Sequence, residues 1–169
     1  LPVIVKDSPG FLVNRILMPY LIEAGRLFED GVEIREIDEA LLDFGMPMGP
    51  LRLLDEVGLD VALHVAKTME DAFEDRMKVP PILVKMVEAG MLGKKSGKGF
   101  YLYGAGKKGS EVIINEAAAG LRESSKSLKM DRAVIADLLT LLMVDEGAHC
   151  LEEGIVRKTP DIDLAMIMG

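Results

Sequence analysis

Apolar residues recur along most of this chain at the spacing of α-helices. In residues 11–29 they fall on nearly every helical face, which is typical of a central helix that is buried on all sides. Ser8 and Pro9 have the residue types that favour the N-cap and the first helical position, so we expect the helix to begin there. Pro19 is expected to bend this helix, and Gly31 is expected to end it.

Further stretches with helical periodicity follow, and most are bounded by glycine, proline or aspartate. Asp60 and Asp131 are the expected caps of two of these helices. A short strand-like run, "FYLY", lies in a loop rich in glycine and lysine. The expected helices cover residues 34–45, 49–58, 60–73, 80–90, 114–124 (the weakest pattern) and 131–153. The pattern therefore predicts an all-α fold with a marginal strand at the N-terminus.

Two segments of the chain resemble each other. Residues 21–45 match residues 142–169, and Gly25 aligns with Gly147, 122 positions later. The offset drifts by a few residues along the match, as small insertions in loops would cause. The alternative is a chance similarity between two amphipathic helix pairs. On the repeat interpretation the second copy is shorter than the first, so we expect the chain to be trimmed at both ends.

Composition narrows the class of protein. With 169 residues, of which 49% are hydrophobic, the chain can build a core, while a net charge of −8 argues against nucleic acid as a partner. No apolar run reaches the ~18 residues of a membrane span. The single cysteine, Cys150, excludes an internal disulfide and favours a cytoplasmic location. His64 and His149 lie too far apart to suggest a metal site, and nothing pairs with Cys150 to form a nucleophile.

One polar residue stands out in the first helix. Asn14 is expected to share a face with Phe11, Leu17, Met18 and Leu21. A buried amide without partners costs about 1–3 kcal/mol, so it must bind something. Its partner is either backbone near the start of the helix or a group bound from outside, and helix periodicity alone leaves both open.

Two glycine-containing segments also have two interpretations each. The turn at Gly49-Pro50, with Asp55 nearby, either presents a helix N-terminus to a cleft or is a rigid turn whose aspartates, Asp55 and Asp60, serve as caps. The lysine-rich loop that follows residue 92 either attracts the phosphates of coenzyme A or is a solvated turn. It lacks the P-loop spacing, so the solvated turn is favoured. Its lysines are Lys94, Lys95 and Lys98.

Three motifs, taken in order, resemble a known family. "VKDSPGFLVNRILMPYLIEAG", "IDEALLDFGMPMGPLRLLDEVGLD" and "KKSGKGFYLY" are similar to the C-terminal domain of L-3-hydroxyacyl-CoA dehydrogenases over residues 2–103. Residues 131–169 resemble the degenerate second copy found in multifunctional fatty-acid oxidation proteins. The resemblance implies an all-α fold, that of the helical C-terminal domain of the 3-hydroxyacyl-CoA/6-phosphogluconate dehydrogenase type with a truncated second copy.

The resemblance also implies a division of the chain. Residues 1–8 would be the last strand and junction of a preceding Rossmann-type domain, 9–103 the helical domain, 104–130 a linker and 131–169 the truncated second copy. In this family the preceding domain binds NAD and supplies a catalytic histidine and glutamate, so no catalytic, cofactor or metal residue is assigned in this chain. Asn14 matches the asparagine that lines the family's active-site cleft, and it is the expected substrate-binding residue.

The implied function is the substrate-binding and dimerisation-type domain of an NAD-dependent enzyme of fatty-acid β-oxidation. That enzyme oxidises L-3-hydroxyacyl-CoA to 3-ketoacyl-CoA, and its parent chain also carries an enoyl-CoA hydratase domain. The expected partners are the acyl-CoA substrate and the upstream Rossmann domain, with a second copy or a thiolase subunit as further candidates. The isolated fragment is expected to be inactive. Two alternatives stay open: a short-chain 3-hydroxybutyryl-CoA dehydrogenase domain, and a helical association module without chemistry.

Overall fold

The computed structural model describes residues 2–104, 113–123 and 126–168. Its regular structure is almost entirely helical, which confirms the predicted all-α fold. The α-helices are α1 (Val13–Glu29), α2 (Ile34–Phe44), α3 (Pro50–Val57), α4 (Leu59–Phe73), α5 (Pro81–Glu88), α6 (Glu116–Ala119), α7 (Arg132–Glu152) and α8 (Thr159–Met168). Two 3-10 turns, η1 (Glu74–Met77) and η2 (Lys94–Ser96), and two short strands, β1 (Tyr101–Leu102) and β2 (Ile113–Ile114), complete it.

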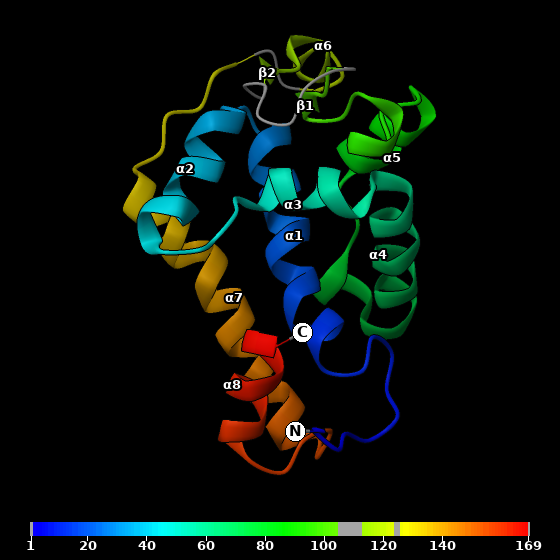
Figure 1. The fold of residues 1–169 in the computed structure, drawn as a ribbon, viewed down its shortest axis with the longest axis vertical. Helices are drawn as coiled ribbons and strands as arrows, with labels where there is room; N and C mark the ends of the chain where they lie inside the picture. Colours follow the sequence, from blue (N-terminus) through cyan, green and yellow to red (C-terminus); the bar gives the residue numbers. More distant parts are fainter. Residues whose placement is uncertain (1, 105–112, 124–125, 169) are drawn as a thin grey trace.

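The long helix α1 forms the centre of the molecule. It packs most extensively against α7, while α3, α4 and α5 contact its other sides (Figure 1). Most of its residues are buried, as the all-round apolar pattern predicts. Gly31, with a φ of +109°, follows the helix end at Asp30 and confirms the predicted stop.

The predicted start of α1 is wrong. The helix begins at Val13 rather than at Ser8 and Pro9. Gly10 and Phe11 both have positive φ values, +71° and +53°, and a chain in this conformation cannot continue a right-handed helix. The segment therefore makes a turn, in which the Phe11 amide donates to the Ser8 carbonyl at 2.8 Å, before α1 starts.

The boundaries of α2, α3 and α7 follow the sequence closely. Gly45 and Pro50 end α2 and start α3 as expected, and the Asp131 side chain caps α7 by accepting from the Ala133 amide at 2.8 Å. Asp60 is not a cap, because α4 already begins at Leu59. No described helix has the length and apolarity needed to cross a bilayer.

The ends of α1 and α7 have the same geometry. Val32 and Ile155 each donate an amide hydrogen bond of 2.9 Å to the carbonyl five residues earlier. Each follows a glycine with positive φ, +109° at Gly31 and +69° at Gly154. The same geometry follows α2 at Gly45 and α5 at Gly90, so it does not distinguish a repeat from a common helix end. The internal repeat stays a prediction, and "second repeat" below denotes residues 131–169.

The segment between the two repeats is partly folded onto the first. Residues 105–112 and 124–125 of the expected linker, 104–130, lie outside the described residues. Within its described part, β2 pairs antiparallel with β1, and Ala118 is fully buried in the core. The helix expected at 114–124 is a single turn, Glu116–Ala119, because Gly120 follows it.

Residues 2–8 have no regular secondary structure. They run beside residues 150–156, where Val3 and Val5 pack against a buried apolar cluster. Its members are Leu12, Ile16, Cys150, Ile155 and Val156. The Lys6 amide donates to the Ile155 carbonyl at 2.8 Å. A strand needs the backbone of a neighbouring strand, so the expected strand in this segment stays a prediction about a longer chain.

Candidate functional site

Asn14 lies in the first turn of α1 with its side chain exposed to solvent. Within the described part of the chain its amide has no hydrogen-bond partner. The expected burial of this side chain is therefore wrong. The helix buries its neighbour Arg15 against α7, and that orientation turns Asn14 outward. Its role in substrate binding stays a prediction, since an exposed amide is free to bind a group from outside the chain.

The surroundings of Asn14 are apolar and held in a fixed turn. Phe11, three residues earlier, is 59% exposed, and Leu17, three residues later, is half-buried. A side chain at Gly10 would overlap the terminal methyl group of Met69 in α4, so the turn is packed closely onto that helix. Phe11 and Asn14 are thus both exposed at the start of α1, a few residues after the segment 2–8.

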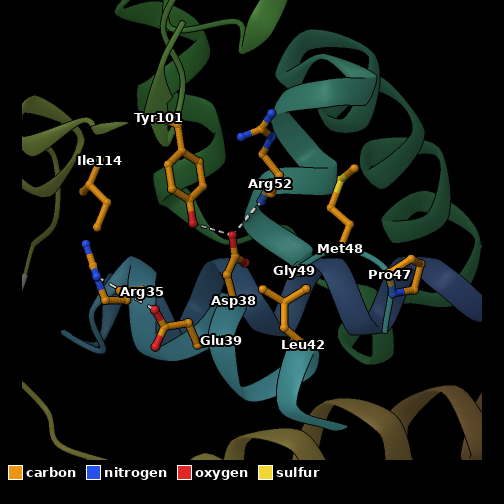
Figure 2. A pocket seen from close by; sticks show the side chains of 10 residues that line it. All are labelled: Arg35, Asp38, Glu39, Leu42, Pro47, Met48, Gly49, Arg52, Tyr101 and Ile114. Carbon is orange, nitrogen blue, oxygen red and sulfur yellow. Dashed lines mark hydrogen bonds and ion pairs between the residues drawn. The ribbon is translucent and has the colours of Figure 1, made fainter. Parts of the chain in front are cut away.

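A buried carboxylate holds the start of α3. Asp38 of α2 accepts hydrogen bonds from the amides of Leu51 and Arg52, at 2.8 and 3.0 Å, and from the Tyr101 hydroxyl at 2.6 Å (Figure 2). Burial raises the pKa of Asp38 to about 6, against the opposing effect of these three donors. The N-terminus of α3 is thus occupied from within the chain, which favours the rigid-turn interpretation of Gly49-Pro50.

A second buried carboxylate fixes the loop that contains "FYLY". Asp55 accepts from the amides of Phe100 and Tyr101, at 3.0 and 2.9 Å, and from the Tyr103 hydroxyl at 2.9 Å. Its pKa is also raised to about 6 by burial. The prediction that Asp55 caps a helix is wrong, because its partners lie 45 to 48 residues away. The second and third family motifs therefore fold into one network.

A pocket of about 490 Å³ opens between α2, α3 and the β1–β2 pair (Figure 2). Its charged residues are paired within the chain, as Arg52 binds Glu56 at 3.1 Å and Arg35 lies 3.9 Å from Glu39. Asn14 is not among its lining residues, so it does not join Asn14 in one site. The lining residues are Arg35, Asp38, Glu39, Leu42, Pro47, Met48, Gly49, Arg52, Tyr101 and Ile114.

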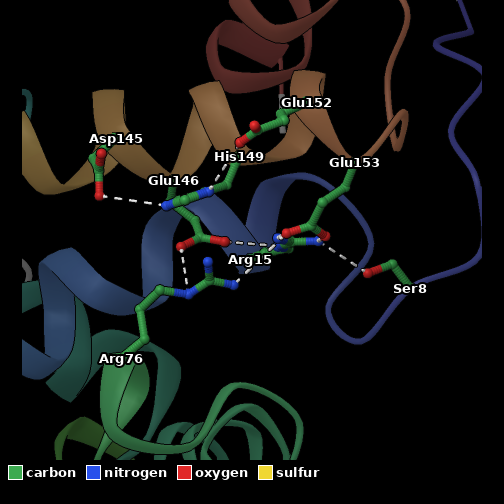
Figure 3. Close-up of polar contacts among 8 residues, drawn as sticks. All are labelled: Ser8, Arg15, Arg76, Asp145, Glu146, His149, Glu152 and Glu153. Carbon is green, nitrogen blue, oxygen red and sulfur yellow. Dashed lines mark hydrogen bonds and ion pairs between the residues drawn. The ribbon is translucent and has the colours of Figure 1, made fainter.

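Arg15, the residue after Asn14, is completely buried in a polar cluster between the repeats (Figure 3). Its Nε donates to Glu146 at 2.7 Å, and its two terminal nitrogens donate to Glu153 at 2.8 Å each. The guanidinium stacks on the Phe73 ring at 4.4 Å. Burial opposes the charge, but the hydrogen bonds to Glu153 and Glu146 outweigh it and raise the pKa of Arg15 above its usual value.

A second arginine completes this cluster. Arg76 lies over the same Phe73 ring at 4.9 Å and approaches Glu146 at 3.5 Å and Glu153 at 3.9 Å. We call these four charged residues and the ring the Arg15 cluster. Two positive and two negative charges balance within it. Helix periodicity did not predict this cluster, and the available signal was an arginine on a helix that is otherwise apolar on nearly every face.

The lysine-rich loop is largely neutralised by the chain itself. Lys94 pairs with Glu56 at 2.7 Å, and Lys95 forms an ion pair with Asp60. Lys98 is exposed. Because two of the three lysines already have carboxylate partners, the loop is better explained as a solvated turn than as a phosphate-binding site.

The remaining candidates do not form a catalytic group. His64 is exposed on α4, and His149 lies 3.8 Å from Asp145 and from Glu152 on the surface of α7. Cys150 is buried, and burial raises the pKa of its thiol, which disfavours the nucleophilic thiolate. Among the described residues no three histidine, cysteine or carboxylate side chains gather as metal ligands would.

Comparison with known proteins places this geometry in context. The family model described as "3-hydroxyacyl-CoA dehydrogenase, C-terminal domain" matches residues 10–103. The fatty acid oxidation complex subunit alpha of Idiomarina loihiensis is 42% identical over 168 residues, which is 99% of this chain and 23% of that protein. The chain therefore spans about a quarter of the length of the curated relatives it matches.

Two solved structures resemble different shares of the chain. The 3-hydroxybutyryl-CoA dehydrogenase of Escherichia coli has a TM-score of 0.74 and 26% identity, covering 99% of this chain and 52% of that one. FadB2 of M. tuberculosis has a TM-score of 0.57 and 48% identity, covering 58% of this chain and 35% of that one. One of these structures thus matches nearly the whole chain, and the other matches little more than half of it.

Proposed function

This chain belongs to the family of 3-hydroxyacyl-CoA dehydrogenase C-terminal domains, and we propose that it forms one wall of the cleft in which a 3-hydroxyacyl-CoA is oxidised. The product is the 3-ketoacyl-CoA, the substrate has the L configuration, and the reaction belongs to fatty-acid β-oxidation in the cytoplasm. The observation that carries the proposal is Asn14, an exposed amide without a partner in the described chain. The proposal assigns residues 1–8 to the junction with a preceding domain.

The chemistry suits an uncharged donor. Oxidation of a secondary alcohol transfers a hydride from carbon and a proton from oxygen, and it leaves a carbonyl oxygen. The side-chain amide of Asn14 donates a hydrogen bond to this oxygen without adding a charge, and so orients the reacting carbon. A base and a hydride acceptor are also needed, and the proposal assigns both to the preceding domain.

NAD is the proposed hydride acceptor when bound to that domain. The spacing G-x-G-x-x-G occurs at residues 104–109, after β1, but the NAD-binding fingerprint belongs to a βαβ unit with parallel strands. In the described part of this chain β1 pairs with β2 in an antiparallel sheet, and no βαβ unit is present. No residue of this chain is therefore offered as an NAD ligand. For the same reason we expect the isolated 169 residues to show no dehydrogenase turnover.

The end of the molecule around Asn14 suits contact with another domain. Phe11 is 59% exposed and Ile4 is 88% exposed, so both this turn and the segment before it leave apolar side chains in water. A domain that precedes residue 2 in the longer protein would lie against this surface and cover it. Association with a second copy or with a thiolase subunit is a further proposal for the parent protein.

The length of the acyl chain is a second question. A 3-hydroxybutyryl-CoA dehydrogenase matches 99% of this chain, which makes a short substrate compatible with the internal repeat. The curated relatives are named for fatty acid oxidation, which leaves longer acyl chains as the second candidate. Comparing kcat/KM for C4 and longer 3-hydroxyacyl-CoA substrates decides between the two.

The test of the proposed function uses the longer protein that contains this chain. Asn14→Ala and the isosteric Asn14→Asp are compared with wild type in NADH formation from a 3-hydroxyacyl-CoA. We expect both to lower kcat/KM at least tenfold, with Asn14→Asp the worse because its carboxylate repels the substrate oxygen. Lys67→Ala, an exposed change on α4, is the matched control and should stay within twofold. Asn14 variants that also stay within twofold would refute the proposal.

A further inference from the structure

The Arg15 cluster begins one residue after Asn14 and joins the start of α1 to the second repeat. We propose, resting on the function proposed above, that Arg15 is a positioning residue for Asn14. Through its guanidinium, the carboxylates of Glu146 and Glu153 hold the first turn of α1 in the orientation that substrate binding needs. The second repeat then contributes to the reaction from outside the cleft.

No side-chain cap holds the first turn of α1. Its N-cap is Leu12, which has no side-chain hydrogen bond to the helix, and the residue before it, Phe11, has a φ of +53°. An apolar N-cap leaves the first amides without the acceptor that serine or aspartate supplies. The orientation of this turn must therefore be set by contacts from elsewhere.

The contacts of Arg15 have the geometry to set that orientation. The planar guanidinium donates three hydrogen bonds of 2.7–2.8 Å to two carboxylates and stacks on Phe73 at 4.4 Å. Such a group has few ways to move, unlike an ammonium on a flexible stem. Successive helical residues point about 100° apart, so fixing the direction of Arg15 also fixes the direction in which Asn14 leaves the helix.

The same repeat holds the segment that leads into α1. The Lys6 amide donates to the Ile155 carbonyl at 2.8 Å, and Ser8 Oγ lies 3.4 Å from the Arg15 guanidinium. Val3 and Val5 pack on the apolar cluster at the end of α7. The second repeat is thus in contact with both the entry of the chain and the start of α1, so it fixes their relative position.

The chain offers a matched control at the far end of α7. Arg132 also joins the repeats through carboxylates, at 2.9 Å to Glu36 and 3.1 Å to Asp43, and through a further ion pair to Glu39. It lies at the first residue of α7, whereas Arg15 binds the last two turns. A change at Arg132 perturbs the contact between the repeats without touching the turn that carries Asn14.

The experiment compares four variants of the full-length protein that contains this chain: Arg15→Lys, Arg132→Lys, Asn14→Ala and the double variant Asn14→Ala/Arg15→Lys. Lysine keeps the charge at either arginine but cannot make the bidentate contact. We expect Arg15→Lys to lower kcat for 3-hydroxyacyl-CoA oxidation at least tenfold with KM changed less than threefold. Arg132→Lys should stay within twofold. The double variant should be no more than twofold worse than Asn14→Ala, because Arg15 acts through that residue.

The outcomes distinguish a failure of the positioning role from a failure of the proposed function. If Asn14→Ala is damaging and Arg15→Lys stays within twofold of wild type, the positioning role fails and the proposed function stands. If the losses of the two single variants multiply in the double variant, Arg15 acts independently of Asn14 and the positioning role also fails. A silent Asn14→Ala overturns the proposed function itself.

A milder variant covers the case in which Arg15→Lys does not fold. Glu153→Gln keeps Arg15, Glu146 and Phe73 in place, and the Glu153 side chain is 42% exposed, so no buried charge loses all its partners. We expect kcat to fall at least threefold while KM changes less than twofold. A wild-type kcat in a folded Glu153→Gln protein would overturn the positioning role.

Discussion

Arg15 and Glu153 lie 138 residues apart in the sequence, yet they form a two-point ion pair with both nitrogen–oxygen distances at 2.8 Å. Glu146 accepts a hydrogen bond from the Nε of the same guanidinium, and both Arg15 and Glu146 are buried. Charges in such a setting are stabilised by one another rather than by solvent. A change in one partner therefore exposes how much the contact between the repeats depends on them.

Replacing Arg15 with methionine should destabilise the chain strongly. The change leaves Glu146, only 2% exposed, with Arg76 at 3.5 Å as its remaining cationic partner. Breaking a buried pair on one side costs about 3–5 kcal/mol, and the half-exposed Arg76 should reduce this to about 3 kcal/mol. Urea unfolding of the 169-residue chain, followed by circular dichroism, measures the loss. Arg35→Met, at a mostly exposed side chain, is the control and should change stability by less than about 0.5 kcal/mol.

Adding Glu146→Gln to Arg15→Met should recover part of that loss. The double variant no longer buries an uncompensated carboxylate, so we expect it to be more stable than Arg15→Met by about 1 kcal/mol or more. If the two losses simply add, the cost at Arg15 is lost packing rather than an orphaned charge.

Glu153→Gln should destabilise the chain at neutral pH and lose this effect in acid. The hydrogen bond from Arg15 lowers the pKa of Glu153 below its usual value, against a smaller opposing effect of burial. A lowered pKa means that the ionised group contributes stability above its unfolded pKa, and this contribution is lost as the pH falls through the folded pKa. Urea unfolding at pH 7.5 and pH 4 should show the larger wild-type advantage at the higher pH. An advantage that is equal at both pH values would contradict the assignment.

The sequence predicted those features of the fold that depend on local spacing. The all-round apolar pattern of α1, the glycine that follows it and the aspartate that caps α7 all involve neighbours within a few residues. Where local rules failed, a distant contact was the cause. The start of α1 moved from Ser8 to Val13, and Ser8 instead lies against the guanidinium of Arg15, which binds α7.

The candidate site was predictable in part for the same reason. Asn14 was found through the motif that contains it, but its exposure depends on which side of α1 the second repeat covers. Asp55 was expected to cap a helix, whereas its partners are backbone amides at 100 and 101. Helix periodicity carries no information about which of two polar residues in one turn, Asn14 or Arg15, meets a carboxylate more than 130 residues away.

Asn14→Ala should leave the stability of the chain unchanged. Its side chain is exposed and makes no hydrogen bond within the described residues, so its removal should change the unfolding free energy by less than about 0.5 kcal/mol. Thermal or urea unfolding of the 169-residue chain tests this. A loss above 1 kcal/mol would show that Asn14 supports the fold, and would make a structural explanation sufficient for any loss of activity.

Gly99→Ala should disrupt the network around Asp55. A methyl group at Gly99 would overlap the Asp55 carboxylate, which holds the amides of Phe100 and Tyr101. The carboxylate would have to move and leave buried donors unsatisfied, so we expect a loss of about 2 kcal/mol or more. Gly104→Ala is the matched control, because that position has no neighbouring atom within 4 Å and should tolerate the change. Equal melting temperatures for the two variants would contradict this account.

Asp55 should give a pH dependence opposite in sign to that of Glu153. Burial raises its pKa from the usual 3.8 to about 6. A raised pKa means that the folded state holds its proton more tightly, so the stability contributed by this group is greatest below about pH 4 and is lost as the pH rises through 6. Asp55→Asn removes the titration and mismatches one donor at every pH. The cost of Asp55→Asn should therefore be larger at pH 4.5 than at pH 7.5, by up to about 2 kcal/mol.

Urea unfolding of the wild type, Asp55→Asn and Glu153→Gln at the same pH values measures the stability lost in each variant. This loss should fall with rising pH for Asp55→Asn and rise with pH for Glu153→Gln. If the stability lost in Asp55→Asn is the same at pH 4.5 and pH 7.5, the Asp55 carboxylate is ionised at both. Its amide and hydroxyl donors would then lower its pKa by more than burial raises it.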